Sequence, residues 1–247
     1  MAFTGFHPNA FGFLEGLAEH NDRAWFHEHE AEYKGLLLEP ARELVIALGE
    51  RLAVAAPCIH ADPRVNGSIM RIARDTRFSN DKTPYKTHLD LWLWEGSGPS
   101  RECAGYFVRL DSDAVTLGVG VHHFTSAGLA AYRRAVDDGK RGPKLDRAVR
   151  SALTAGARFG PARWKRVPVP YAADHPRAEL LRHDGLVAAT TDPLPPQAQT
   201  EAFPEWCVER WKPLRPLQAW VAAVAKEAAR EADVTAGRRA SRPSTRS

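Results

Sequence analysis

The sequence predicts an α+β domain in which an antiparallel sheet of about four or more strands is flanked by N-terminal and C-terminal helices. Apolar residues recur at helical spacing in the N-terminal part of the chain and again near the C-terminus. Between residues 68 and 122 apolar and polar residues alternate instead, which is typical of half-buried strands. Helices therefore precede and follow the strands rather than alternating with them, and this order favours an α+β fold over a parallel α/β fold.

Three helices are predicted before the sheet. Pro8 or Asn9 begins the first, and Asp22 is a suitable N-cap for a second that runs to about Tyr33. Pro40 suits the first turn of a third helix, because that turn does not use the amide hydrogen that proline lacks. The apolar residues of the third helix share one side of it: Ala41, Leu44, Val45, Leu48 and Leu52.

Four segments predict the strands. Residues 69–74 are short and rich in apolar side chains, and residues 88–94 alternate so that their leucines share one face. Residues 104–110 and 114–121 predict two further strands, joined by a turn at 111–113. Because short turns join neighbouring strands that run in opposite directions, we expect an antiparallel sheet.

Helices return after the sheet. The sequence predicts helices over 125–137, 143–155 and 177–183, with a proline-rich extended segment at 157–176. The last helix has the clearest apolar stripe, which indicates that it packs against the core. The stripe consists of Leu217, Trp220, Val221, Val224, Ala225 and Ala228.

The composition is that of a soluble globular protein, since 44% of the residues are hydrophobic and 26% are charged. No apolar run approaches the roughly 18 residues that a membrane helix needs, so we expect no membrane contact. The N-terminal residues lack the basic region of a secretory signal. Three scattered cysteines favour free thiols in a reducing compartment. We therefore expect a cytoplasmic protein, and the sequence leaves its oligomeric state open.

The formal net charge of +4 comes from the end of the chain. Residues 238–247 contain four arginines and no acidic residue; without them, 30 of the 34 lysines and arginines remain against 30 acidic residues. We expect residues 1–235 to form one neutral domain and residues 236–247 to form a disordered basic tail. A neutral domain disfavours nucleic acid as the main partner, although the tail allows weak, salt-sensitive contact with polyanions.

The stretch RIARDTRFSNDKTPYK at residues 71–86 crowds five cationic side chains between two apolar runs. Its turn residues and Pro84 predict a loop that is fixed between two strands. Arginine can bind two phosphate or carboxylate oxygens in one plane and lysine acts as a point charge, so the sequence predicts that these groups converge on one anion. The expected ligand-binding residues of the loop are Arg74, Arg77, Ser79, Lys82 and Lys86.

Three residues are candidates for acid–base chemistry on such a ligand. Asp75 is expected to orient the arginines or to act as a base, and Tyr85 and His122 are further candidates. A structural interpretation of the same loop stays open. In that interpretation neighbouring aspartates and cations form ion pairs that lock the loop, each contributing about 0–1 kcal/mol.

Residues 74–88, RDTRFSNDKTPYKTH, resemble the signature of the domain of unknown function 2461 family, a conserved hypothetical protein of bacteria and fungi. The resemblance spans roughly residues 3–212 and includes FGFLEGLAEHNDRAWF at 11–26. It implies no particular activity, but a signature so dense in polar groups favours a shared site over packing alone. His122-His123 departs from the family pattern. Further matching positions are Asn21, Trp25, Phe26, Tyr33, Gly118, Gly120, Arg133, residues 164–168, residues 174–176 and residues 179–181.

The resemblance adds a second group of expected ligand-binding residues. Arg133 matches an arginine of the family pattern, and residues 164–166 match its later block. On this basis we expect Arg133, Trp164, Lys165 and Arg166 to complete the cleft around the anion.

No metal site and no cofactor are expected. The run His27-Glu28-His29-Glu30 fails the HExxH pattern because residue 31 is alanine. His122 and His123 are adjacent in a predicted strand and therefore point to opposite faces. The glycines at 118 and 120 lack the third glycine and the following helix of a dinucleotide-binding loop.

Three functions stay open. The leading expectation is binding of a small phosphate- or carboxylate-bearing molecule at the 71–86 loop. The second is an enzyme, such as a hydrolase or a transferase, that acts on this ligand. The third is a nucleic-acid or protein interaction module, which the neutral domain makes the least favoured.

Overall fold

The computed structural model describes residues 2–96 and 98–240 of the chain. Within these residues six strands form one antiparallel sheet in the order β1-β2-β3-β4-β6-β5. The predicted α+β class and the antiparallel sheet are therefore confirmed. The strands are β1 (Ile59–His60), β2 (Leu89–Glu95), β3 (Ala104–Leu110), β4 (Ala114–Val121), β5 (Arg158–Phe159) and β6 (Leu186–Pro193).

The sheet differs from the sequence prediction in one predicted strand and in the strands that were not predicted. Residues 69–74 form isolated bridges rather than a continuous strand: Ile69 pairs with Leu91 of β2, and Ala73 pairs with Tyr85. Three strands are absent from the prediction: the two-residue strands β1 and β5, and the whole of β6. The core-facing positions of β6 include a small alanine and a polar threonine, so the alternation of hydrophobicity is weak there.

The N-terminal helices follow the predicted order. Asp22 caps α2 as expected, because its Oδ1 accepts hydrogen bonds from the amides of Ala24 and Trp25 at 2.8 and 2.9 Å. The helix predicted to run to Tyr33 is interrupted at His29 and continues into a π-helical turn. The elements are α1 (Asn9–Glu19), α2 (Arg23–Glu28), α3 (Glu30–Glu32), η1 (Tyr33–Leu38) and α4 (Glu39–Leu52).

The C-terminal part also contains the predicted helices. The last helix, α9, runs to Ala240 and so includes the first five residues of the predicted tail, 236–247; residues 241–247 lie outside the described residues. Alanine and arginine are strong helix formers, which favours this extension. The helices are α5 (Ser126–Asp137), α6 (Arg141–Thr154), α7 (Ala178–Leu181), α8 (Phe203–Trp211) and α9 (Arg215–Ala240), with short 3-10 turns η2 (Ser100–Glu102), η3 (Pro196–Gln199) and η4 (Lys212–Leu214).

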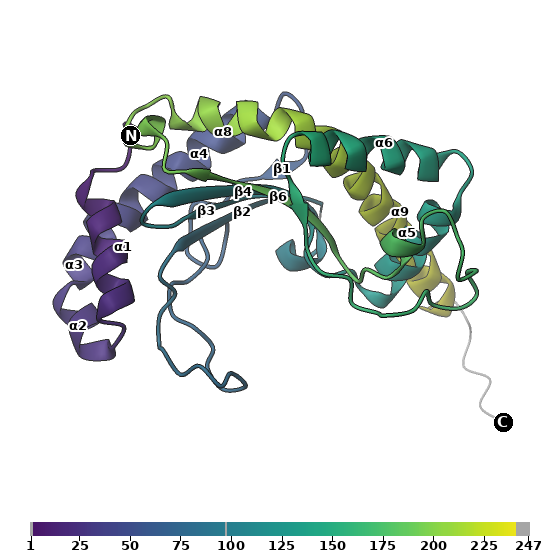
Figure 1. Cartoon of the computed structure of the whole chain (residues 1–247), viewed down its shortest axis with the longest axis horizontal. Helices are drawn as coiled ribbons and strands as arrows, with labels where there is room; N and C mark the ends of the chain where they lie inside the picture. The colour runs from purple at the N-terminus through teal and green to yellow at the C-terminus, as the bar shows by residue number, and fades with distance from the viewer. Residues whose placement is uncertain (1, 97, 241–247) are drawn as a thin grey trace.

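One face of the sheet carries the hydrophobic core. The leucines of β2 and the alternate residues of β3 and β4 are buried on this face, against α4, α8 and α9. Figure 1 shows α4 and α8 lying across the sheet on this side. Gln218 of α9 joins the two layers, since it accepts a hydrogen bond from the Gly120 amide at 3.1 Å and donates one to Glu95 at 2.8 Å. The opposite face of the sheet is left partly exposed.

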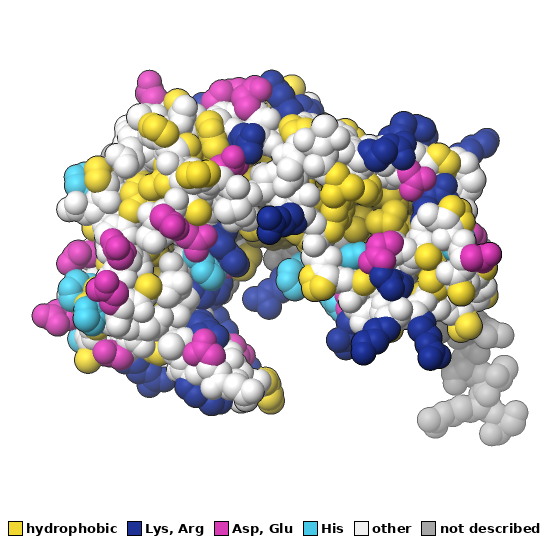
Figure 2. Space-filling model, viewed as in Figure 1, with side chains coloured by type: hydrophobic (Ala, Val, Ile, Leu, Met, Phe, Trp, Pro, Cys, Tyr) yellow, Lys and Arg dark blue, Asp and Glu magenta, His cyan; other side chains and the backbone are white. Residues whose placement is uncertain are grey.

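The molecule arches around this opposite face, which we call the open face (Figure 1). A hairpin of residues 72–86, here called the arm, leads directly into the start of β2. The far wall, formed by α5 and residues 158–177, follows the end of β4. Since the start of β2 and the end of β4 lie at opposite ends of the paired strands, the arm and the far wall face each other across the sheet. Figure 2 shows a hollow between them, with lysine and arginine side chains on both sides.

Candidate functional site

The arm is held at its base by residues from the N-terminal helices. The Asn21 side chain donates a hydrogen bond to the Tyr85 carbonyl and accepts one from the Tyr85 amide, both at 3.0 Å. The ring of Phe26 stacks on the ring of Tyr85 with a centroid distance of 4.1 Å. Backbone hydrogen bonds between residues 72–74 and 84–86 close the hairpin. The family motif at 11–26 therefore fixes the position of the arm.

The cationic groups of the arm do not converge as predicted. Arg74 hydrogen-bonds to Asp81 and Thr83, whereas Arg77 binds Asp75 with two hydrogen bonds of 3.0 and 2.7 Å. The Arg77 side chain is 77% exposed. The physical reason is local, because a carboxylate two residues away reaches the guanidinium without any movement of the backbone.

The other residues of the arm have partners of their own. Lys82 donates a hydrogen bond to the Thr76 carbonyl at 2.9 Å, and Lys86 contacts Asp90 on the sheet at 3.1 Å. The Ser79 amide donates to the same Thr76 carbonyl at 3.4 Å. The arm is thus a cross-braced hairpin, as in the structural interpretation, although the partners differ from the neighbours that the sequence suggests.

The ion pairs of the arm keep its carboxylates ionised. Two hydrogen bonds from Arg77 lower the pKa of Asp75 to about 2, and hydrogen bonds from Thr83 and Arg74 lower the pKa of Asp81 to about 2. A general base works best when its pKa lies near the working pH. The geometry therefore gives Asp75 a bracing role and makes it a weak base at neutral pH.

An ionic cluster lies on the open face, directly below the arm. Asp90 is its centre: Arg109 donates to one carboxylate oxygen at 2.8 Å, while Lys86 at 3.1 Å and His88 at 3.3 Å approach the other. Burial alone would raise the pKa of Asp90, but the hydrogen bonds and charges of His88 and Arg109 outweigh it and hold that pKa below its usual range. Asp111 lies beside His88 at 3.9 Å.

Of these residues, only Lys86 is expected from the sequence. Asp90 and Arg109 sit directly opposite each other on β2 and β3. Two predicted strands that carry opposite charges at alternating positions could have indicated this pair. The sequence does not provide the strand register, however, and without the register the two residues cannot be matched.

The open face is organised in three rows that run across the strands. The ionic row starts at Asp90, the middle row at Trp92 and the outer row at Trp94. In order across the sheet, the ionic row contains Asp90, Arg109, Thr116 and Thr191; the middle row contains Trp92, Phe107, Gly118, Ala189 and Arg158; the outer row contains Trp94, Gly105, Gly120 and Val187.

Glycines on this face make room for aromatic rings. A Cβ atom on Gly105 would lie 2.8 Å from the Trp92 ring, and one on Gly118 would lie 2.1 Å from the Phe107 ring. Both rings therefore lie across the neighbouring strand. Beside them, Trp94 stacks on His60 with a centroid distance of 5.2 Å and an angle of 13° between the rings.

The far wall carries the second group of predicted ligand-binding residues, Arg133 and residues 164–166, and some of them are in contact. The guanidinium of Arg133 lies over the Trp164 ring, 4.5 Å from its centroid. The backbone next to Trp164 is fixed by Arg182, whose carbonyl accepts from the Trp164 amide and whose guanidinium donates to the Lys165 carbonyl, both at 3.1 Å. The side chains of Lys165 and Arg166 are exposed. Arg133 and residues 164–166 thus form one group, separate from the arm.

His122 is exposed at the end of β4, next to the far wall. Asp75 and Tyr85 belong to the arm at the other end of the strands, so the three candidate acid–base residues do not form one constellation. His123 contacts Asp184 at 3.4 Å. Because β4 ends at Val121, neither histidine lies in a strand, and the strand alternation used to predict that they point to opposite faces does not apply to them.

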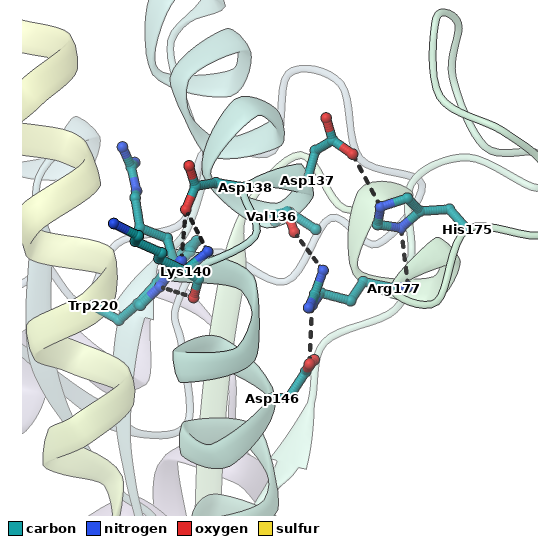
Figure 3. A network of polar contacts seen from close by, with 9 residues as sticks. Val136, Asp137, Asp138, Lys140, Asp146, His175, Arg177 and Trp220 are labelled. Carbon is teal, nitrogen blue, oxygen red and sulfur yellow. Dashed lines mark hydrogen bonds and ion pairs between the residues drawn. The ribbon is translucent and has the colours of Figure 1, made fainter.

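A polar network positions the far wall (Figure 3). His175 contacts Asp137 at 3.2 Å, and Arg177 donates hydrogen bonds to Asp146 at 2.9 Å and to the Val136 carbonyl at 3.1 Å. The Arg177 side chain is only 12% exposed, so its pairing with Asp146 fixes α5, α6 and the extended segment relative to one another.

A second depression, of about 690 Å³, lies between α6 and α9. None of the predicted site residues lines it. At one end Arg141 pairs with Glu227 at 2.9 Å and accepts a hydrogen bond from Trp220 on its carbonyl at 3.0 Å. These contacts join the two helices, and we therefore regard the depression as the groove along which α6 and α9 pack.

Among the residues that the structure describes, no group of three or more His, Cys, Asp or Glu side chains is arranged to hold a metal ion. No helix within residues 2–96 and 98–240 has the length and apolar character needed to cross a membrane.

Comparison with known proteins identifies a family. The family described as "Conserved hypothetical protein (DUF2461)" matches residues 9–220, which include the arm, the open face and the far wall. No curated protein and no solved structure matches the chain.

Proposed function

We propose that this chain, which belongs to the DUF2461 family of conserved hypothetical proteins, binds a ligand in the hollow between the arm and the far wall. The ligand bears phosphate or carboxylate groups. In this proposal the far wall supplies the principal cation, Arg133, and the arm supplies a second cationic surface opposite it. The ligand therefore lies between the two walls instead of at the tip of the arm.

The observation that carries the proposal is that the Arg133 guanidinium has buried N–H donors without a partner among the described residues. Its Nε and Nη2 atoms are buried and have no hydrogen-bond partner among residues 2–96 and 98–240. A buried donor without a partner costs about 1–3 kcal/mol, and more when it is charged, so such a group points to an acceptor that the protein itself does not supply. Trp164 holds the guanidinium plane in place without using any of its N–H groups.

The charge of both walls supports the same ligand. Residues 158–166 contain four basic residues and no acidic one, and residues 71–86 contain five basic residues and two acidic ones. Lys165 and Arg166 form no ion pair with the described residues. A concave surface lined by one sign of charge attracts ligands of the opposite sign.

Calorimetric titration with tripolyphosphate and with citrate tests the proposal. The variant Arg133→Gln removes the charge and the fork of donors, and we expect it to bind the preferred probe about 10-fold to 150-fold more weakly, the range for a charged hydrogen bond of about 1.5–3 kcal/mol. Arg134→Gln is the matched control, because Arg134 lies on the same helix but pairs with Glu231 at 2.7 Å. We expect this control to bind within about twofold of the wild type.

Thermal melting of both variants is needed beside the titration, since Arg133 also packs on Trp164. Equal affinity in the wild type and in a folded Arg133→Gln variant, for both probes, would remove the proposal.

A further inference from the structure

We infer that the ligand of the hollow is single-stranded nucleic acid, whose bases stack on the aromatic side chains of the open face while its phosphates contact the cations around it. The inference rests on the proposed function, because it gives a chemical class to the anion that the walls would hold.

The aromatic side chains of the open face are not needed for the core. Trp92, Trp94 and Phe107 are partly exposed, whereas the leucines that alternate with them on β2 are buried under α4, α8 and α9. Three large aromatic groups on the face that these helices leave open form a surface suited to planar ligands, because every base has a π-face that can stack on a ring.

The glycines keep this surface flat. With Gly105 and Gly118 beneath them, the rings of Trp92 and Phe107 lie across the strands instead of standing between taller side chains. The parallel pair of His60 and Trp94 extends the aromatic surface towards β1. Exposed aromatic side chains on an antiparallel sheet are a recurring way in which proteins bind unstacked bases.

Cations border the aromatic surface on several sides. At the arm end, Arg109 lies on the ionic row, one row from Trp92, and Lys86 contacts Asp90 of the same row. In the middle row itself, Arg158 lies on the same cross-strand line as Trp92 and Phe107, beyond Gly118 and Ala189. The far wall adds Lys165 and Arg166. Bases over the rings would therefore have phosphates within reach of several basic groups.

The neutral composition of the domain does not oppose this inference, because its charges are segregated. Residues 9–52, in the N-terminal helices, contain nine acidic and four basic residues, and these acids offset the basic excess of the arm and the far wall. Figure 2 shows acidic side chains on the outer side of the lobe that carries α1 to α3, and basic side chains bordering the hollow.

The ring surface distinguishes single strands from other polyanions. Bases in a duplex are paired and stacked on each other, so they cannot lie on Trp94 or Phe107. Inorganic polyphosphate has the charges but no rings. The proposed ligand is therefore the polyanion whose affinity depends on the aromatic residues as well as on the cations.

Fluorescence anisotropy with a labelled single-stranded RNA or DNA of twelve nucleotides tests the inference, with unlabelled polyphosphate of similar length as the competitor. We expect Trp94→Leu and Phe107→Leu each to weaken oligonucleotide binding about 5-fold to 150-fold, which corresponds to about 1–3 kcal/mol per stacked base. Polyphosphate binding should stay within about twofold. Trp94→Phe keeps a ring and should retain most of the oligonucleotide affinity, which separates stacking from a loss of folding.

Trp206→Leu is the matched control, because Trp206 is a partly buried aromatic residue on α8, over the other face of the sheet. We expect no change in oligonucleotide affinity. Three results would overturn the inference: oligonucleotide binding no tighter than polyphosphate binding, no effect of either leucine variant, or a mononucleotide that binds as tightly as the oligonucleotide. In each of them the proposed function stands if polyphosphate binding still depends on Arg133. Loss of binding to every anion would remove both.

Discussion

Replacing Asn21 by alanine should release the arm from the N-terminal helices. The Asn21 side chain makes two hydrogen bonds to the backbone of Tyr85, both at 3.0 Å, and the site is partly buried. At about 0.5–1.5 kcal/mol for each net hydrogen bond, the variant should lose about 1–3 kcal/mol of unfolding free energy. For a domain of this size that loss corresponds to a fall in Tm of about 2–12 °C.

Two measurements check this prediction. Denaturant unfolding gives the change in free energy, and hydrogen exchange of the Tyr85 amide reports the local contact, because this N–H donates to Asn21. Asn80→Ala is the matched control, since Asn80 is exposed near the tip of the same arm. An Asn21→Ala variant with both the unfolding midpoint and the protection of the Tyr85 amide unchanged would contradict this prediction.

A change of pH tests the ion pairs of the arm, and a substitution tests the packing of Arg177 against α6. Lowering the pH from about 4 to about 2 should lower Tm. In the folded protein the pKa values of Asp75 and Asp81 are lowered from 3.8 to about 2, so the native state binds protons less readily than the unfolded chain. The stabilisation that these carboxylates give above their unfolded pKa is therefore lost as the pH falls through about 2. The loss should be smaller in Asp81→Asn, and an identical pH profile would contradict this. Gly142→Ala should lower Tm, because its Cβ would lie 2.4 Å from the Arg177 guanidinium carbon; overpacking of this kind costs about 1–3 kcal/mol, whereas Gly139→Ala, with open space around it, should be neutral.

The sequence predicted those elements whose signals are local. Asp22 caps α2 because an aspartate oxygen reaches the next two amides without help from the rest of the fold. The strands β2, β3 and β4 were predictable from the alternation of their own residues. β6 was not, because its place in the sheet is decided by pairing with β4, and small residues such as Ala188 suffice at a position that the helices already cover.

The candidate site was harder to predict, because its geometry depends on pairs that are distant in the sequence. The density of charge in residues 71–86 drew attention to the segment that forms the arm, but it did not indicate that Arg74 would pair with Asp81 within the arm. The contact between Arg133 and Trp164 joins two residues whose shared role only the family resemblance suggested. Whether the arm and the far wall bind one ligand stays a prediction.

The two walls of the hollow are held in place by clamps that lie outside it. Asn21 fixes the base of the arm, and the pairing of Arg177 with Asp146 fixes the segment that carries Trp164. Both clamps are partly buried polar contacts between segments far apart in the chain. A surface that is ordered before binding loses less conformational entropy when the ligand arrives, so affinity rises without any added contact. If the walls serve a ligand, loosening either clamp should therefore weaken anion binding through residues that never touch the anion. If the walls are only braces, Asn21→Ala should reduce stability and leave the affinity of the folded protein unchanged.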